Sequence, residues 1–155
     1  MLKKVISDLY IKYVKGTENG AIVADRKAFL CHLTSAVIKG VELETQKSYV
    51  STRIIKHLYD KKPAEEFEFL VNNIHSIVKY PDMVYENKQG KRAGFCFVKK
   101  IKSEQYICCI EVVHTPSEED TIPEAHVVTA YRIRKEDYLK GYRLLWSWKG
   151  DNPSS

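Results

Sequence analysis

Apolar residues recur at helical spacing in four segments of the first half of the chain. These segments predict amphipathic helices at residues 2–15, 25–38, 52–60 and 63–79. Ser51 is a residue type that caps helices well, and it stands immediately before the third segment. Residues 41–50 are polar and weakly patterned, so no element is predicted there.

The pattern changes in the second half, where polar residues are set into runs with the composition and alternation of strands. These runs predict strands at residues 83–87, 93–101, 105–114 and 127–134. Short turns between neighbours favour an antiparallel meander. Residues 115–124 are acidic and contain two prolines, so we expect a mobile loop or the rim of a substrate site there. Residues 142–148 are expected to form a fifth strand or an aromatic cover.

Helices followed by strands predict an α+β fold. With 155 residues, the chain is expected to form one domain over residues 1–150, followed by a disordered tail at 151–155. No apolar run approaches the roughly 20 residues that span a bilayer, and no signal-peptide core is visible, so we expect a cytoplasmic protein. The four cysteines lack Cys-x-x-Cys spacing and stand in apolar contexts, which predicts buried free thiols.

Charge adds a weak indication of the partner. The formal net charge of +5 fits attraction to a polyanion but does not require one. Basic residues gather at 88–102 and 132–143, and acidic residues gather at 65–68 and 118–120. If the two basic segments are neighbours in one sheet, its open side carries a positive field. The alternative is a set of solvated strand ends.

The third predicted helix carries the best candidates for chemistry. Cleavage of RNA without a metal needs a base for the 2′-hydroxyl proton, an acid for the leaving oxygen, and cations for the phosphate. Histidine suits proton transfer, and arginine can hold a phosphate with two parallel donors. Arg53 and His57 are four residues apart and share one side of the helix, with Lys56 close to that side. The alternative is an exposed basic helix surface.

The strands supply further candidates. Alternation puts Thr129 and Tyr131 on the same side of the last predicted strand as Val127, although both residue types are also ordinary in strands. Glu111 stands among apolar neighbours and is interpreted as a general base, as a tether for Arg92 or Arg132, or as a solvated carboxylate. The remaining candidates are cations that could contact phosphates: Arg92, Lys99 and Arg132.

The sequence lacks a glycine-rich phosphate loop, His-Glu-x-x-His and Gly-x-Ser-x-Gly. These absences count against nucleoside triphosphatases, zinc proteases and esterases. They do not by themselves select a nuclease. We expect neither a metal nor a cofactor at the site.

Three short motifs resemble a known family. They are Ser51-Thr52-Arg53-Ile54-Ile55-Lys56-His57, Val78-Lys79-Tyr80-Pro81-Asp82-Met83-Val84-Tyr85 and Val127-Val128-Thr129-Ala130-Tyr131. Over residues 48–145 the chain resembles the phage-associated nuclease domains grouped with barnase, EndoU, the tRNase colicins and RelE. The resemblance implies helices packed on a C-terminal four-stranded antiparallel sheet. It also implies metal-free RNA cleavage through a 2′,3′-cyclic phosphate.

Carried onto matching positions, the resemblance points to His57, Thr129 and Tyr131, and to Arg53 and Lys56 in the same helix motif. Residues 1–45 lie outside it and would form a helical extension. The expected function is therefore an endoribonuclease of phage, mobile-element or toxin type, acting on RNA and, if a toxin, controlled by an inhibitor or immunity protein.

Two alternatives stay open at this point. One is a catalytically inactive nucleic-acid-binding module, in which basic strands and tyrosines hold the backbone and the bases. The other is a protein-interaction domain that exposes the aromatic residues of 142–148.

Overall fold

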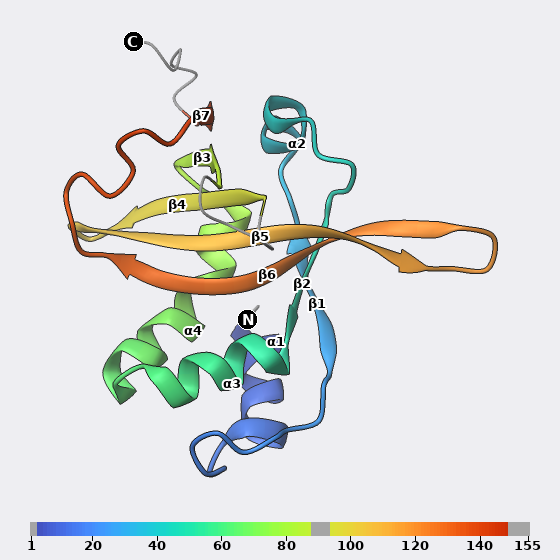
Figure 1. Cartoon of the computed structure of the whole chain (residues 1–155), viewed down its shortest axis with the longest axis vertical. Coiled ribbons are helices and arrows are strands. Elements are labelled where there is room, and N and C mark those ends of the chain that lie inside the picture. The colour runs from blue at the N-terminus through green and yellow to red at the C-terminus, as the bar shows by residue number, and fades with distance from the viewer. Residues whose placement is uncertain (1–2, 88–93, 149–155) are drawn as a thin grey trace.

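The computed structural model describes residues 3–87 and 94–148, which form an α+β fold (Figure 1). The helices are α1 (Lys3–Leu9), α2 (Ser35–Val41), α3 (Thr52–Lys61) and α4 (Ala64–Lys79), with a π-helical turn η1 (Tyr10–Val14) after α1. The strands are β1 (Lys27–His32), β2 (Lys47–Ser51), β3 (Met83–Glu86), β4 (Phe95–Ile101), β5 (Glu104–Pro116), β6 (Thr121–Ile133) and β7 (Leu144–Ser147).

The described strands form one seven-stranded sheet in the order β1-β2-β6-β5-β4-β3-β7. The predicted antiparallel meander is present as β3 to β6. The sheet is wider than the expected four strands because two N-terminal strands join it through a parallel β2–β6 contact, and β7 pairs with β3 at the other edge. The sheet is therefore mixed, with all other neighbours antiparallel.

The helix predicted at residues 25–38 is wrong, because this segment contains β1 and then α2. The apolar residues at helical spacing are split between the two elements, with Phe29 and Leu30 in β1 and Val37 in α2. Within β1, the adjacent residues Leu30 and Cys31 are both buried. A register shift in the β1–β2 pairing between Phe29 and Cys31 permits this. Pairing with β1 also explains why β2 forms within residues 41–50, where the sequence pattern predicted no element.

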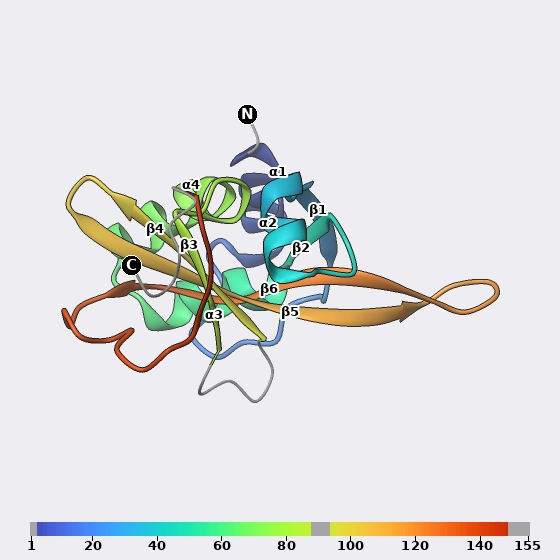
Figure 2. The same ribbon diagram turned by 90° about the horizontal axis from the view of Figure 1, so that it is seen from above.

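The acidic loop predicted at residues 115–124 is also mostly strand. Strands β5 and β6 stay paired as far as Pro116 and Thr121, and their hairpin projects well beyond the rest of the molecule (Figures 1 and 2). Pro123 is tolerated because β6 has a partner on only one side in this arm. Of the two predictions for residues 142–148, the fifth strand is confirmed as β7.

The main hydrophobic core lies between α1, α3, α4 and one face of the sheet. Figure 2 shows α1 and α4 on the same side of the strands. A smaller cluster on the other face includes Cys96, Ile107 and Cys109, and the segment after β6 covers it with Tyr138 and Tyr142. The four cysteines are buried and free, as predicted. None of the helices in the described ranges has the length and apolar character to cross a membrane.

Helix α2 packs so closely on β7 that we expect Gly40→Ala to destabilise the protein. A Cβ atom at Gly40 would overlap Trp146 Cδ1 and lie 2.9 Å from its Cγ. Alanine gains about 1 kcal/mol of helix propensity, but the overlap with a packed ring costs roughly 1–3 kcal/mol. Urea denaturation should therefore give a lower free energy of unfolding for Gly40→Ala.

Gly94→Ala is the matched control, because a Cβ atom there meets nothing within 4 Å. We expect the stability of this variant to equal or slightly exceed that of the wild type. Equal stabilities for the two variants would contradict the described packing of Trp146 on α2.

Candidate functional site

The predicted helix residues lie at a junction between β2, β6 and α3. Strand β2 pairs with β6 only through Ser48 and Tyr49, and α3 begins directly after β2 ends. Beyond this point β6 continues without a strand on that side, and α3 contacts it instead. A cavity of about 470 Å³ opens at this junction, and we call it the edge pocket. Its lining comprises Asp25, Lys27, Ser51, Arg53, Ile54, His57, His126, Val127 and Val128.

Helix α3 supplies Arg53 and His57, which both line the edge pocket. The prediction that they share one side of a helix is confirmed. Ser51 is the N-cap residue, as predicted, but its side chain makes no capping hydrogen bond and lies in the pocket lining instead. Arg53 forms no ion pair with any described residue. A cation and a helix N-terminus, both suited to an anion, therefore meet at this pocket.

Lys56 lies elsewhere on α3 and does not line the edge pocket. Its ammonium lies 2.7 Å from Asp60 Oδ1 and donates to Thr17 Oγ1 and to the Glu18 carbonyl oxygen. The side chain is only 8% exposed. The hydrogen bond from Lys56, together with a weaker one from the Gly20 backbone, lowers the pKa of the Asp60 carboxyl. Lys56 thus fastens the loop after η1 to α3, which replaces its predicted contact with substrate.

Strand β6 supplies His126, and a bulge changes which residues share its side. Val127 pairs with Ile110 of the main core, whereas Thr129 pairs with Cys109 of the cluster on the opposite face. The extra residue between them reverses the simple alternation of side chains. The prediction that Val127 and Thr129 share a side is therefore wrong. His126 instead points to the face that carries Thr129.

Thr129 and Tyr131 lie on that face of the sheet, beyond the edge pocket. Neither is part of the lining that holds His57. The Tyr131 hydroxyl forms a 2.6 Å hydrogen bond with the Tyr138 hydroxyl, and its ring packs in the smaller cluster. Burial and the Tyr138 hydrogen bond raise the pKa of the Tyr131 phenol, which therefore stays protonated at neutral pH. The structure brings together His57 and Arg53 but leaves the two strand residues outside their cavity.

The remaining candidates are dispersed. Glu111 pairs in register with His126 across β5 and β6, so it lies next to the pocket on the same face of the sheet as His126. Arg132, one of the two arginines expected to be tethered by Glu111, lies 3.7 Å from Glu104. Lys99 belongs to a different cavity. Arg92 lies outside the described residues.

Three functional candidates on the sheet, Lys27, Glu124 and His126, escaped sequence reasoning. Glu124 Oε1 accepts hydrogen bonds from Lys27 Nζ at 2.8 Å, His126 Nε2 at 2.9 Å and Thr115 Oγ1 at 2.9 Å. Lys27 and His126, which both line the edge pocket, are thereby fixed on one carboxylate. The Lys27 ammonium also lies 4.9 Å from the centre of the Tyr49 ring. A same-side Glu-x-His pair would have been a usable signal if residues 115–124 had been assigned to a strand.

Burial alone would raise the pKa of the Glu124 carboxyl. The hydrogen bonds from Lys27, His126 and Thr115 outweigh this effect and lower that pKa to about 2. Glu124 is therefore ionised at neutral pH, and it can hold the His126 ring and stabilise a positive charge on it. The lining of the edge pocket holds two imidazoles, two cations and the Asp25 carboxylate, and Glu124 orients His126 and Lys27 from beside it. Imidazoles next to cations are suited to proton transfer at a bound phosphate.

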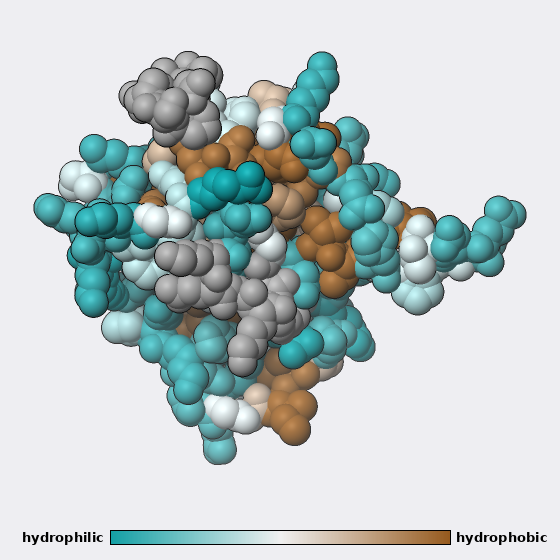
Figure 3. Space-filling model, turned by 45° about the horizontal axis from the view of Figure 1, so that its top comes forward, coloured by the Kyte–Doolittle hydropathy of each residue, from teal (hydrophilic) through white to brown (hydrophobic). Residues whose placement is uncertain are grey.

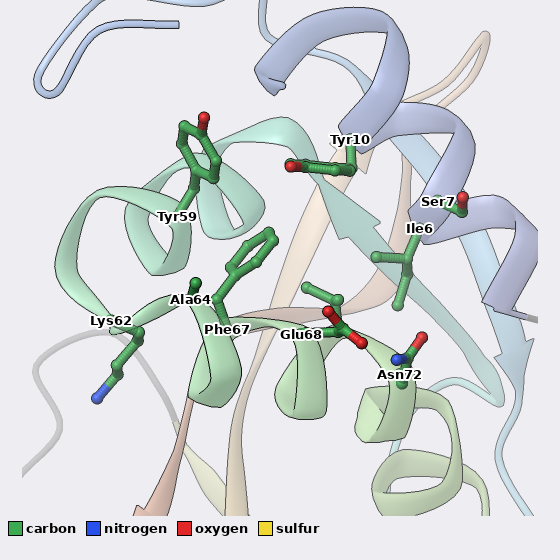
Figure 4. Close-up of a pocket in the computed structure, with 10 residues that line it drawn as sticks. Ile6, Ser7, Tyr10, Tyr59, Lys62, Ala64, Phe67, Glu68 and Asn72 are labelled. Atoms are coloured by element: carbon green, nitrogen blue, oxygen red, sulfur yellow. The ribbon is translucent and has the colours of Figure 1, made fainter. Parts of the chain in front are cut away.

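A second cavity, between α1, α3 and α4, has a different character (Figure 4). The rings of Tyr10, Tyr59 and Phe67 converge there with centroids 5.2–5.7 Å apart, while Lys62 is directed away. Ile6 adds an apolar wall, and the lining contains no imidazole. Aromatic packing between helices accounts for this cavity. The side chains suited to acid–base chemistry lie in the edge pocket instead, which we therefore take as the candidate site.

Separate segments of the chain form the walls of the edge pocket. The motif at Ser51 to His57 supplies its α3 wall. The β1 and β6 walls come from residues outside that motif. Comparison of the chain with protein-family models, with curated proteins and with solved structures finds no match.

Proposed function

We propose that the protein is a metal-independent endoribonuclease with its active site in the edge pocket. The observation that carries the proposal is the meeting of His57 and His126, from a helix and a strand far apart in sequence, in one cavity with Arg53 and Lys27. Two imidazoles can serve as the proton acceptor and the proton donor of a single phosphoryl transfer. The cations supply the charge that the reacting phosphate requires.

The reaction proceeds by attack of the RNA 2′-oxygen on the adjacent phosphorus. His126 takes the 2′-hydroxyl proton, and the new P–O2′ bond forms as the P–O5′ bond breaks. His57, in its protonated form, gives a proton to the departing O5′. The products are a 2′,3′-cyclic phosphate and a 5′-hydroxyl, so no oxidant, metal or water is consumed in this step.

The roles of the two histidines follow from their surroundings. The Glu124 carboxylate accepts from His126 Nε2, which leaves Nδ1 as the proton acceptor and stabilises the imidazolium that forms. His57 has no such carboxylate partner among the described residues. It lies one helical turn from Arg53, which places a proton donor beside a phosphate-binding cation.

Arg53 and the first turn of α3 are proposed to bind the scissile phosphate. Arg53 forms no ion pair with the residues that the structure describes. The Thr52 amide donates to the Arg26 carbonyl oxygen, but the Ser51 side chain caps none of the amides that follow it in the first turn. Lys27 is already fixed by Glu124, so its charge is preorganised at the pocket and needs no rearrangement during the reaction.

The proposal is tested by incubating the full chain with a fluorescently labelled RNA of mixed sequence. We expect cleavage that is unchanged by excess EDTA and products that end in 2′,3′-cyclic phosphate by mass spectrometry. The same sequence as DNA should stay intact, because it lacks the attacking hydroxyl. Cleavage of both polymers, or loss of cleavage in EDTA, would refute the mechanism.

A further inference from the structure

A third cavity lies at the end of the molecule where α2, β3 and β7 meet, away from α3 (Figure 1). It has a volume of about 470 Å³, and we call it the tryptophan pocket. It is lined by Thr34, Ala36, Lys79, Tyr80, Pro81, Asp82, Lys99, Trp146 and Trp148. The chain contains only two tryptophans, and both line this cavity.

The aromatic side chains of this pocket are unusually open to solvent. Tyr80 is 59% exposed and Trp148 is 60% exposed. Trp146 is half-buried because its ring rests on Gly40 of α2. Figure 3, turned so that this end comes forward, shows brown hydrophobic surface next to teal hydrophilic residues, while tryptophan and tyrosine are pale because their hydropathy is intermediate. Large exposed rings at the mouth of a cavity are suited to a flat ligand that stacks on them.

The two lysines of the pocket are held in fixed positions. Lys79 Nζ donates to the His32 carbonyl oxygen at 2.7 Å, and Lys99 Nζ donates to the Tyr80 carbonyl oxygen at 2.8 Å. The carboxylate of Asp82 is partly engaged, since its Oδ2 accepts from the Lys100 backbone amide at 2.7 Å. Asp82 Oδ1 also lies 3.9 Å from Lys99 Nζ, so this carboxylate offsets Lys99, and the charge of Lys79 leaves the pocket net positive. Its ligand should therefore carry negative charge next to its flat part.

We propose that the tryptophan pocket binds unpaired nucleotides of single-stranded RNA. Bases would stack on Trp148 and Tyr80, while Lys79 and Lys99 contact the neighbouring phosphates. A nucleotide combines a planar ring with an anion, and the pocket combines rings with cations, since Lys79 Nζ lies 5.9 Å from the centre of the Tyr80 ring. A base-paired duplex hides the ring faces of its bases. The choice of RNA rests on the proposed function. If the protein is a ribonuclease, the tryptophan pocket holds the RNA that is cut in the edge pocket.

The two tryptophans allow a direct binding experiment. The probe is a 2′-O-methyl oligoadenylate of ten nucleotides, which cannot be cleaved because its 2′-oxygens are blocked. Titration into the full chain should quench tryptophan fluorescence saturably, and added salt should weaken binding. A self-complementary duplex of the same length should quench far less. Absence of saturable quenching, or equal quenching by the duplex, would overturn the proposal.

Substitutions locate the binding. Trp148→Ala and Tyr80→Ala should each weaken oligonucleotide binding by about tenfold, with Trp146 still reporting in both variants. Phe29→Ala is the matched control, because this aromatic is 40% exposed but lies outside the pocket, and its affinity should stay unchanged. Circular dichroism serves as the check that each variant is folded. Unchanged affinity in both pocket variants would refute the site.

The two experiments distinguish failure of the binding proposal from failure of the ribonuclease proposal. Quenching with no RNA cleavage by the wild type would remove the proposed function and leave the tryptophan pocket as a nucleic-acid site. Cleavage of a labelled RNA with no quenching by the blocked oligonucleotide would leave the ribonuclease and remove this pocket from substrate binding.

Discussion

Alanine at His57 or at His126 is expected to lower the rate of RNA cleavage by about 10²–10⁴-fold, the usual range for loss of a general acid or base. Each substitution removes one of the two proton transfers at the edge pocket. The protein should remain folded, because neither imidazole is part of the buried core. The measurement is the initial rate of cleavage of a labelled RNA, with circular dichroism as a check on folding.

The double variant sharpens this test. If both histidines act in the same step, removing the second should lower the cleavage rate much less than removing the first. The reason is that the residual rate of the single variant no longer depends on concerted proton transfer. His114→Ala is the matched control, because His114 lies on β5 outside the edge pocket, and its imidazole is hydrogen-bonded only to the exposed Glu44 among the described residues. Full activity in either single variant would contradict the assignment. A similar loss in the control would point to a general effect of histidine removal.

The α3 side of the site could be predicted from local sequence. Arg53 and His57 are related by helical spacing alone, and α3 begins at the residue that the pattern indicates. Lys56 shows the limit of that reasoning. It is equally close in sequence, but its direction is set by Asp60 and by the loop after η1, with Thr17 lying 39 positions away.

The strand side of the site could not be predicted, because it depends on pairing between distant segments. Lys27 approaches Glu124 only because β1 and β2 join the sheet next to β6, and the apolar residues of β1 resemble a helix. His126 faces the same side as Thr129 only because of a bulge near Val127. Bulges follow from the fit between two strands, so the alternation of a single strand cannot indicate them.

Glu124 is expected to have the second-largest effect, because one carboxylate holds residues from β1, β5 and β6 together. Glu124→Gln keeps the size of the side chain and removes its charge. Hydrogen bonds to a charged group contribute roughly 1.5–3 kcal/mol each, and the amide retains part of them, so we expect a loss of about 2 kcal/mol of stability at neutral pH. Cleavage should also slow, because His126 loses the carboxylate that orients it.

The pH dependence of stability separates this charge effect from simple loss of packing. The pKa of the Glu124 carboxyl is about 2 in the folded protein against an ordinary value of 4.5, so its contribution is complete above pH 4.5. It is lost as the pH falls from 4.5 towards 2. The stability difference between the wild type and Glu124→Gln in urea denaturation should therefore narrow over that interval. A difference that stays constant from pH 7 to pH 3 would show that the ionised carboxylate does not hold Lys27 and His126 in place.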